Sequence, residues 1–104
     1  MIVEERDYHV YTGKLPELVR LYETEGIAIQ LEILGNLIGA FTVEIGSLST
    51  YTHIWGYESF DDRVERRARL VADPRWPPFL DKILPLIDTQ QSRILLPTPF
   101  SPIR

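Results

Sequence analysis

Apolar and polar residues alternate at strand period in four stretches of the chain. The pattern predicts strands over Ile2 to Tyr11, Leu37 to Ile45, Leu48 to Glu58 and Ser92 to Leu96, because successive side chains of a strand point to opposite faces of the sheet. The second and third strands form a predicted β-hairpin across Gly46-Ser47, a pair typical of a tight turn. Gly35-Asn36 is the turn signal that precedes this hairpin.

Between the first strand and the hairpin, apolar residues recur every three or four positions, which is the spacing of a helix. Gly13 and Pro16 mark the start of a helix, since proline fits the first helical turn. Leu15, Leu18, Val19 and Tyr22 form its apolar stripe. Glu25-Gly26 is typical of a helix end, and the pattern over Ile27 to Leu34 favours neither helix nor strand.

After the hairpin, the sequence predicts a helix in two parts. Ser59 is an N-cap, with Asp62 three residues later, and the first part extends to about Ala72. Its predicted apolar face consists of Phe60, Val64, Ala68 and Val71. Asp73-Pro74 starts the second, shorter part, whose apolar stripe consists of Trp76, Phe79, Leu80, Ile83 and Leu84.

The order of elements is therefore βαββαβ with a broken second helix. Right-handed connections in this order give an α+β fold of the ferredoxin-like type, a four-stranded antiparallel sheet with helices on one face. The first and third strands are then neighbours at the centre of the sheet. We expect one domain over residues 1–104, in which the proline-rich residues 97–104 form an extended tail.

The third predicted strand contains the strongest signal for function. Tyr51, His53, Trp55 and Tyr57 share one face of it and are called the aromatic row below. Each ring has an apolar body and a polar tip, which suits the wall of a semi-polar cavity. We therefore expect the row to bind a small molecule.

A two-residue hairpin loop would pair Phe41 with Thr52 and Ile38 with Trp55, so that Ile38 joins the aromatic row. We expect this face to be the one that the helices leave bare. Its apolar area is too large to remain in water. The sequence therefore predicts a homodimer in which two subunits enclose the aromatic row.

Three further residues are expected beside the row. Arg6 and Tyr8 share a face of the first strand with Glu4. An arginine beside a half-buried carboxylate is more often a structural ion pair, although it can also bind the carboxylate of a substrate. Arg63 lies in the first turn of the helix that follows the aromatic strand, whereas the other arginines of that helix are expected to face solvent.

His53 has two interpretations. An isolated histidine between aromatic residues is more often a hydrogen-bonded structural residue than a catalyst. As the one catalytic candidate, it would act as a general base or as a hydrogen-bond donor to a bound carbonyl group.

Composition excludes several classes of function. The net charge is −4, without the basic face that a nucleic-acid-binding protein needs. The absence of cysteine excludes disulfides, thiolate catalysis and Cys-ligated metal. The two histidines lack metal-binding spacing, no phosphate-binding motif is present, and we expect neither metal nor cofactor. No apolar run reaches the roughly 20 residues of a membrane span, and without a leader pattern a cytoplasmic location is expected.

The chain resembles the NIPSNAP family in a series of short motifs that extends over nearly its whole length. The motifs are Glu4-x-Arg6-x-Tyr8, Gly35-Asn36-Leu37-x-Gly39, Glu44-Ile45-Gly46, His53-x-Trp55-x-Tyr57, Arg63-x-x-Arg66, Asp73-Pro74-x-Trp76 and Ser92-Arg93-Ile94-Leu95-x-Pro97. The resemblance implies a dimeric α+β barrel, a fold whose members include cofactor-free monooxygenases and haem-binding enzymes. It implies no settled activity.

Three hypotheses follow. The first is a small-molecule cavity lined by the aromatic row with Arg6, Tyr8 and Arg63, of which a monooxygenase-like site is one form. The second is a non-enzymatic dimer in which the aromatic row forms the dimer core and the outer surface or the tail, Pro97 to Pro102, binds another protein. Haem ligation by His53 is the third and is disfavoured, because a strand crowded by Trp55 leaves little room for a macrocycle.

Overall fold

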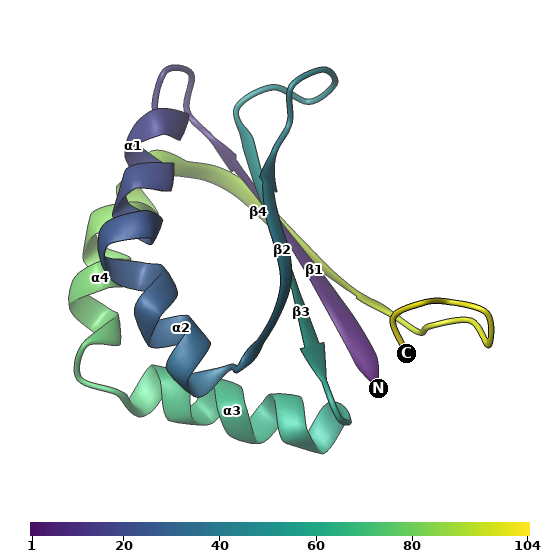
Figure 1. The fold of residues 1–104 in the computed structure, drawn as a ribbon. Helices are drawn as coiled ribbons and strands as arrows, with labels where there is room; N and C mark the ends of the chain where they lie inside the picture. Colours follow the sequence, from purple (N-terminus) through teal and green to yellow (C-terminus); the bar gives the residue numbers. More distant parts are fainter.

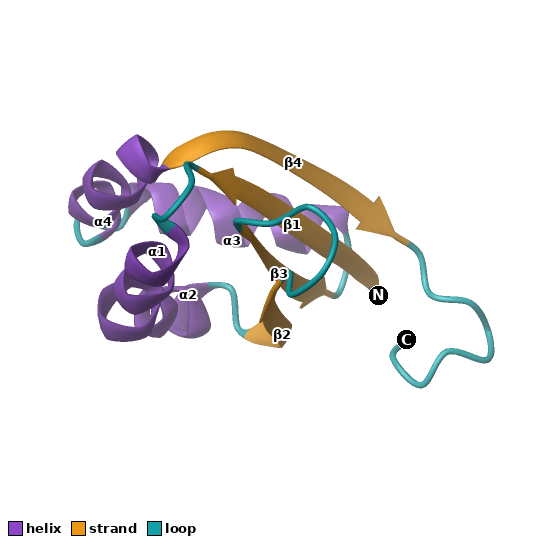
Figure 2. Ribbon diagram, turned by 90° about the horizontal axis from the view of Figure 1, so that it is seen from above, coloured by secondary structure: helices purple, strands orange, loops and turns teal.

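The helices and strands follow one another in the order that the sequence predicts. The computed structural model describes residues 1–104. Its strands are β1 (Ile2–Val10), β2 (Asn36–Thr42), β3 (Thr50–Tyr57) and β4 (Ile87–Leu95), and its helices are α1 (Leu15–Leu21), α2 (Ile27–Ile33), α3 (Phe60–Ala72) and α4 (Trp76–Ile83). The strands form one antiparallel sheet in the order β2-β3-β1-β4. All four helices lie on one side of it (Figures 1 and 2). The ferredoxin-like α+β fold is confirmed.

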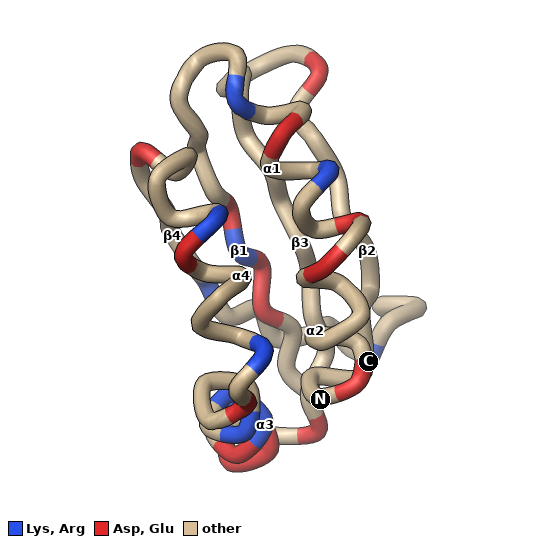
Figure 3. The backbone as a smooth tube through the Cα atoms, turned by 90° about the vertical axis from the view of Figure 1, so that its left-hand side faces the viewer, with Lys and Arg blue, Asp and Glu red and all other residues tan.

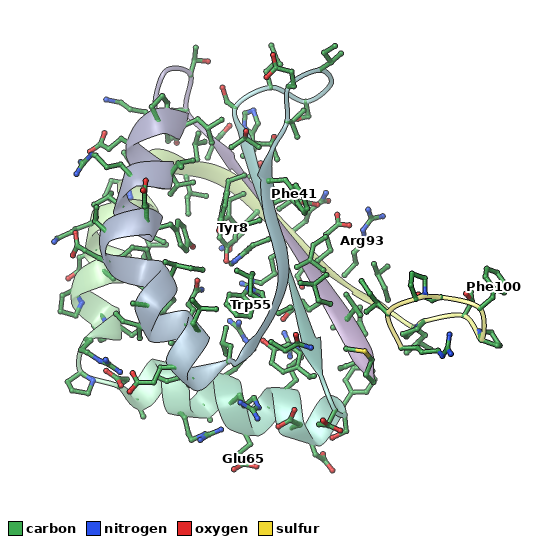
Figure 4. The ribbon with its side chains drawn as sticks, in the orientation of Figure 1. Tyr8, Phe41, Trp55, Glu65, Arg93 and Phe100 are labelled. Atoms are coloured by element: carbon green, nitrogen blue, oxygen red, sulfur yellow. The ribbon has the colours of Figure 1, made fainter.

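The aromatic row faces the helices, so the prediction that it lies on the bare face is wrong. Trp55 and His53 are fully buried within the single chain, and Tyr51 and Tyr57 are at most 5% exposed. We call the helix-covered side of the sheet its inner face and the opposite side its outer face. Figure 4 shows Tyr8 and Trp55 directed from the sheet toward the helices, whereas Arg93 points to the other side. The rings are the largest apolar bodies in the sheet, and burying them against the helices removes the most apolar area from water.

The hairpin differs from its predicted register at one end. Phe41 pairs with Thr52 as expected, but Leu37 rather than Ile38 pairs with Trp55, because the register shifts between Leu37 and Gly39. This bulge places Leu37 on the inner face and leaves Ile38 beside Ile54 on the outer face. The loop is also longer than Gly46-Ser47, since β2 ends at Thr42 and β3 starts at Thr50.

Glu25-Gly26 does not end the first helix. The chain passes from α1 through a π-helical turn, Tyr22–Gly26, directly into α2. A Cβ atom at Gly26 would lie 2.3 Å from Cζ of Phe79, so this glycine allows α4 to pack closely on the turn. The true end of the helix is at Gly35, whose φ of +87° suits glycine.

Helix α3 is turned relative to its predicted orientation. Ser59 caps it as expected, accepting a hydrogen bond from the backbone N–H of Asp62 at 3.1 Å. The predicted apolar face, however, is exposed, with Phe60, Val64 and Val71 at 55%, 61% and 65%. The side toward the sheet instead holds Leu70 together with half-buried arginines, including Arg63, Arg66 and Arg67. Figure 3 views α3 end-on, with acidic and basic residues gathered around it.

The hydrophobic core lies between the inner face and the helices. Leu18, Leu34, Leu70 and Phe79 belong to the same buried cluster as Trp55 and are each at most 1% exposed. None of the four helices combines the length and the apolar character needed to cross a bilayer.

We predict that Gly26→Ala destabilises the fold by about 1–3 kcal/mol, because the added methyl group overlaps the Phe79 ring. Urea unfolding followed by circular dichroism measures the change. In a Phe79→Leu background the same substitution should cost clearly less, since the smaller side chain vacates the overlapped space. Equal costs in the two backgrounds would show that this contact is not the cause.

Candidate binding site between the sheet and the helices

A buried carboxylate lies at the centre of the site. Glu4 is on the inner face of β1 and is fully buried. Its Oε2 accepts hydrogen bonds from Nη1 of Arg6 at 3.0 Å, Nη2 of Arg63 at 2.8 Å and Oγ of Ser92 at 2.5 Å. Its Oε1 accepts a bond from Nε of Arg63 at 3.1 Å. These four residues, contributed by β1, α3 and β4, are called the Glu4 cluster.

The Glu4 cluster keeps its carboxylate ionised. Burial alone raises the pKa of Glu4, but the hydrogen bonds from Arg63 and Ser92 and the charge of Arg6 outweigh it and lower the pKa from 4.5 to about 2. The interpretation of Arg6 as part of a structural ion pair therefore fits its contacts. Because α3 contributes Arg63, the cluster also ties this helix to the middle of the sheet.

Aromatic rings surround the cluster on the side of the first helix. Nε of Arg6 donates to Oη of Tyr8 at 2.9 Å. The Tyr8 ring lies 5.1 Å from the imidazole of His53, and Tyr22 of the π-helical turn lies 4.8 Å from Tyr51, between ring centroids. The register explains this gathering, since Arg6 pairs with His53 and Tyr8 pairs with Tyr51 across β1 and β3.

His53 is oriented by its neighbour on the same strand face. Nε1 of Trp55 donates to Nδ1 of His53 at 2.9 Å, so the proton of the neutral imidazole lies on Nε2. Burial and the positive charge of Arg6 lower the pKa of His53 from 6.5 to about 3. At neutral pH the ring is thus an uncharged hydrogen-bond donor, and it is poorly suited to accept a proton or to ligate haem iron through Nε2.

Two buried polar atoms of the aromatic row lack a partner. They are Nε2 of His53 and the hydroxyl oxygen of Tyr57. Oε1 of Gln30, on α2, is a third such atom in the molecule. Buried polar groups in folded proteins are nearly always hydrogen-bonded, so both atoms call for a partner that the protein does not supply, either a water molecule or an atom of a bound molecule.

The site approaches solvent along β4. The middle of this edge strand is open to solvent, where Gln90 and Ser92 are exposed, whereas Ile87 and Ile94 near its ends pack against the core. The side chains of Arg6 and Arg63 are 16% and 25% exposed. At the opposite edge, a mainly apolar groove of about 360 Å³ lies between β2 and the first helix, and Tyr22 and Tyr51 form part of its wall.

All seven residues expected to bind a ligand lie together on the inner side. They are Arg6, Tyr8, Tyr51, His53, Trp55, Tyr57 and Arg63. The sequence interpretation missed Ser92, Tyr22 and Arg67. Ser92 pairs with Arg6 across β1 and β4. The alternation of side chains along the last strand could therefore have placed Ser92 on the inner face. Arg67 was expected to face solvent but is half-buried, because α3 is turned.

Arg66 has a structural role at the edge of the site. Its Nη1 donates to the carbonyl oxygens of Ile33 and Leu34 at 3.2 and 3.4 Å, and its Nε donates to Asp62 at 2.8 Å. These bonds cap the end of α2. No three His, Asp or Glu side chains in the structure gather in a way that could hold a metal ion.

Comparison with known proteins places the chain among relatives of known fold. The family model described as NIPSNAP matches residues 3–102. The human protein NipSnap homolog 3A is 34% identical over 99 residues, covering 93% of this chain and 39% of that protein. The NipSnap homolog of Dictyostelium discoideum is 32% identical over 94 residues, covering 90% and 41%. The chain thus spans about two fifths or less of the length of the first curated relatives it matches.

Solved structures agree with this relationship. Atu4242 of Agrobacterium tumefaciens is 47% identical, covers 100% of both chains and superposes with a TM-score of 0.98. Atu5224 of the same organism, a NIPSNAP family protein, is 54% identical over 99% of this chain and 90% of that chain, with a TM-score of 0.97. An antibiotic biosynthesis monooxygenase shares the fold alone, at 7% identity, with coverage of 95% and 100% and a TM-score of 0.65.

We predict that the Glu4 cluster makes stability depend on acid pH. Because the pKa of Glu4 is lowered from 4.5 to about 2, its contribution is present above about pH 4.5 and is lost as pH falls toward about 2, with a magnitude of about 3 kcal/mol. Urea unfolding from about pH 7 to about pH 3 should show Glu4→Gln strongly destabilised at neutral pH and closer to the wild type in acid. Asp81→Asn, at an exposed residue without an ion pair, is the control and should follow the wild type throughout.

Proposed function

The chain belongs to the NIPSNAP family, and we propose that it binds a small molecule on the inner face of its sheet, against His53, Tyr57 and the Glu4 cluster. The observation that supports this proposal is the pair of buried, unpartnered atoms, Nε2 of His53 and the Tyr57 hydroxyl oxygen. Leaving a buried polar group unpaired costs about 1–3 kcal/mol. A ligand that supplies hydrogen-bond acceptors to both atoms would remove this cost.

If the site is catalytic, His53 acts in it as a donor. Its pKa of about 3 makes it too weak a base to remove protons efficiently at neutral pH. A neutral N–H directed at a carbonyl or at a developing oxyanion would instead stabilise negative charge on the ligand. A monooxygenase-like reaction in this site would therefore rely on His53 to polarise the substrate, while the rings of Tyr8 and Tyr51 hold a flat substrate in place.

The tail supports the alternative, a protein-interaction module. Phe100 is 85% exposed and Leu96 is 71% exposed, and Figure 4 shows Phe100 at the tip of the tail, away from the sheet. Ile103 and Ser101 lie close to the sheet, where they line a hollow of about 250 Å³ on the outer face. The tail thus presents an aromatic side chain while its end packs near the sheet.

We also propose that two copies of the chain associate through the outer face. With the aromatic row buried under the helices, the apolar residues that remain outside are different from those expected. They include Phe41 at 58% exposure and Leu95 at 40%, and Leu95 lines a hollow together with Ile38 and Ile54. A sheet face with this apolar content favours a second sheet over water. A dimer formed in this way leaves the small-molecule site within each subunit.

Ligand binding can be tested through the indole of Trp55, whose N–H bonds to His53. We expect that, in a screen of small aromatic acids, amides, phenols and amines, at least one class shifts the Trp55 indole signal in the proton–nitrogen NMR spectrum. His53→Phe should weaken that binding about tenfold or more through loss of a buried hydrogen bond. His9→Phe, at the other histidine, whose side chain is 40% exposed, is the matched control. Absence of any binder in all four classes would refute the proposal.

Dimer formation can be tested by sedimentation at micromolar concentration. We expect the wild-type chain to have the mass of a dimer and Phe41→Asp to have that of a monomer, because a buried unpaired carboxylate is strongly unfavourable in an interface. Val64→Asp, on the exposed side of α3, should leave the dimer intact. Dissociation by Val64→Asp alone would assign the interface to α3 instead, and a monomeric wild type would refute the dimer.

A further inference from the structure

We propose that the ligand is a small organic acid whose carboxylate lies among Arg67, His53 and Tyr57. This inference rests on the proposed small-molecule site and specifies the chemistry that the site selects. The protein leaves several hydrogen-bonding groups of this site unused, and the charges around them are unbalanced.

The unused groups of the site are donors. Both oxygens of Glu4 are occupied, by Arg6, Arg63 and Ser92. Arg6 uses Nε and Nη1, and Arg63 uses Nε and Nη2, so one terminal nitrogen of each guanidinium has no bond within the protein. Nε2 of His53 carries a proton, and the Tyr57 hydroxyl is unpaired. A ligand rich in acceptors can bond to all of these groups, whereas an amine would find an acceptor only in the Tyr57 hydroxyl oxygen.

The charge of the site is also unbalanced. Arg6, Arg63 and Arg67 carry three positive charges, and Glu4 carries one negative charge. Arg67 is half-buried on the sheet side of α3 and forms no ion pair, in contrast to Arg66, which pairs with Asp62. Burial is the largest cause that lowers the pKa of His53, and the charges of Arg6 and Arg67 lower it further. Arg67 also lowers the pKa of Tyr57, through its charge and its side-chain contact with the hydroxyl, against the larger effect of burial. An anion between Arg67 and His53 would balance part of this excess.

A carboxylate suits the site better than a phosphate group does. The rings of Tyr8, Tyr22, Tyr51 and His53 lie 4.8 to 6.3 Å apart between centroids and pack on one another, so the surroundings of the carboxylate would be apolar and aromatic, which suits an organic body. A planar carboxylate accepts two parallel bonds from a guanidinium. Burying one negative charge also costs less than burying the two of a phosphate monoester. Since Nε2 of His53 is out of reach of solvent, the acid would displace the partly exposed side chain of Arg6 or Arg63 on its way in.

The experiment compares matched acids and amides on the intact chain. Benzoate and salicylate are titrated against benzamide and salicylamide, with the Trp55 indole signal as the measure of binding. We expect each acid to bind about tenfold or more tightly than its amide, because a charge-assisted bond is lost with the charge. Arg67→Gln should weaken acid binding about tenfold and leave amide binding unchanged, whereas Arg67→Lys should recover part of the affinity. Arg69→Gln, an exposed arginine of the same helix, is the control.

The outcomes separate this inference from the proposed function. An amide that binds as tightly as its acid, or acid binding that is unaffected by Arg67→Gln, overturns the organic acid while leaving the small-molecule site in place. If only amides, phenols or amines bind in the screen of the four compound classes, the organic acid is likewise overturned and the small-molecule site remains. If no compound of any class shifts the Trp55 signal, the small-molecule site itself is refuted and the inference with it.

Discussion

The requirement to neutralise Glu4 inside the protein determines much of this structure. A carboxylate that is fully buried needs compensating charge and donors close by. One arginine comes from the same strand and the other, Arg63, from α3. To bring Arg63 to the carboxylate, α3 must turn its basic side toward the sheet. Phe60, Val64 and Val71 are consequently left in solvent, against the usual preference of an amphipathic helix.

The same inner face combines this charged centre with the largest rings of the chain. Trp55 and His53 are fully buried, and Trp55 holds the imidazole in a single orientation through its indole N–H. Gly26 lets the Phe79 ring approach the π-helical turn. In this turn, Tyr22 contacts Phe79 on one side and Tyr51 on the other. π-helical turns inside helices are frequent at functional sites. Here the turn contributes one of the rings around the proposed ligand.

The arrangement has a consistent chemical character. The oxygens of its carboxylate are hydrogen-bonded, most of its unused groups are donors, and its positive charges outnumber its negative ones. Such a site stabilises negative charge, whether that charge belongs to a bound ligand or develops during a reaction. The curated relatives that the chain matches are considerably longer, with 39% of human NipSnap homolog 3A covered, whereas Atu4242 is covered over its whole length.

Local patterns in the sequence were sufficient to predict the order of the elements, the ferredoxin-like sheet and the gathering of Arg6, Tyr8 and the aromatic row on one face. Strand period and the order of the strands determine which residues share a face, so these features need no knowledge of packing. Which face the helices cover is not a local property, because it depends on how much area each alternative buries. The bulge at Ile38 likewise depends on pairing with a distant strand.

Helix α3, which contains Arg67, and Gly26 also depend on residues that are distant in the sequence. From sequence alone, Phe60, Val64 and Ala68 formed the apolar face of α3, and Gly26 was a helix end. Only the folded structure shows that the charge of Glu4 attracts the opposite side of α3, and that Gly26 is small because Phe79 lies against it. Periodicity records local preference, whereas a buried charge and a close contact between helices are decided by residues far apart in the chain.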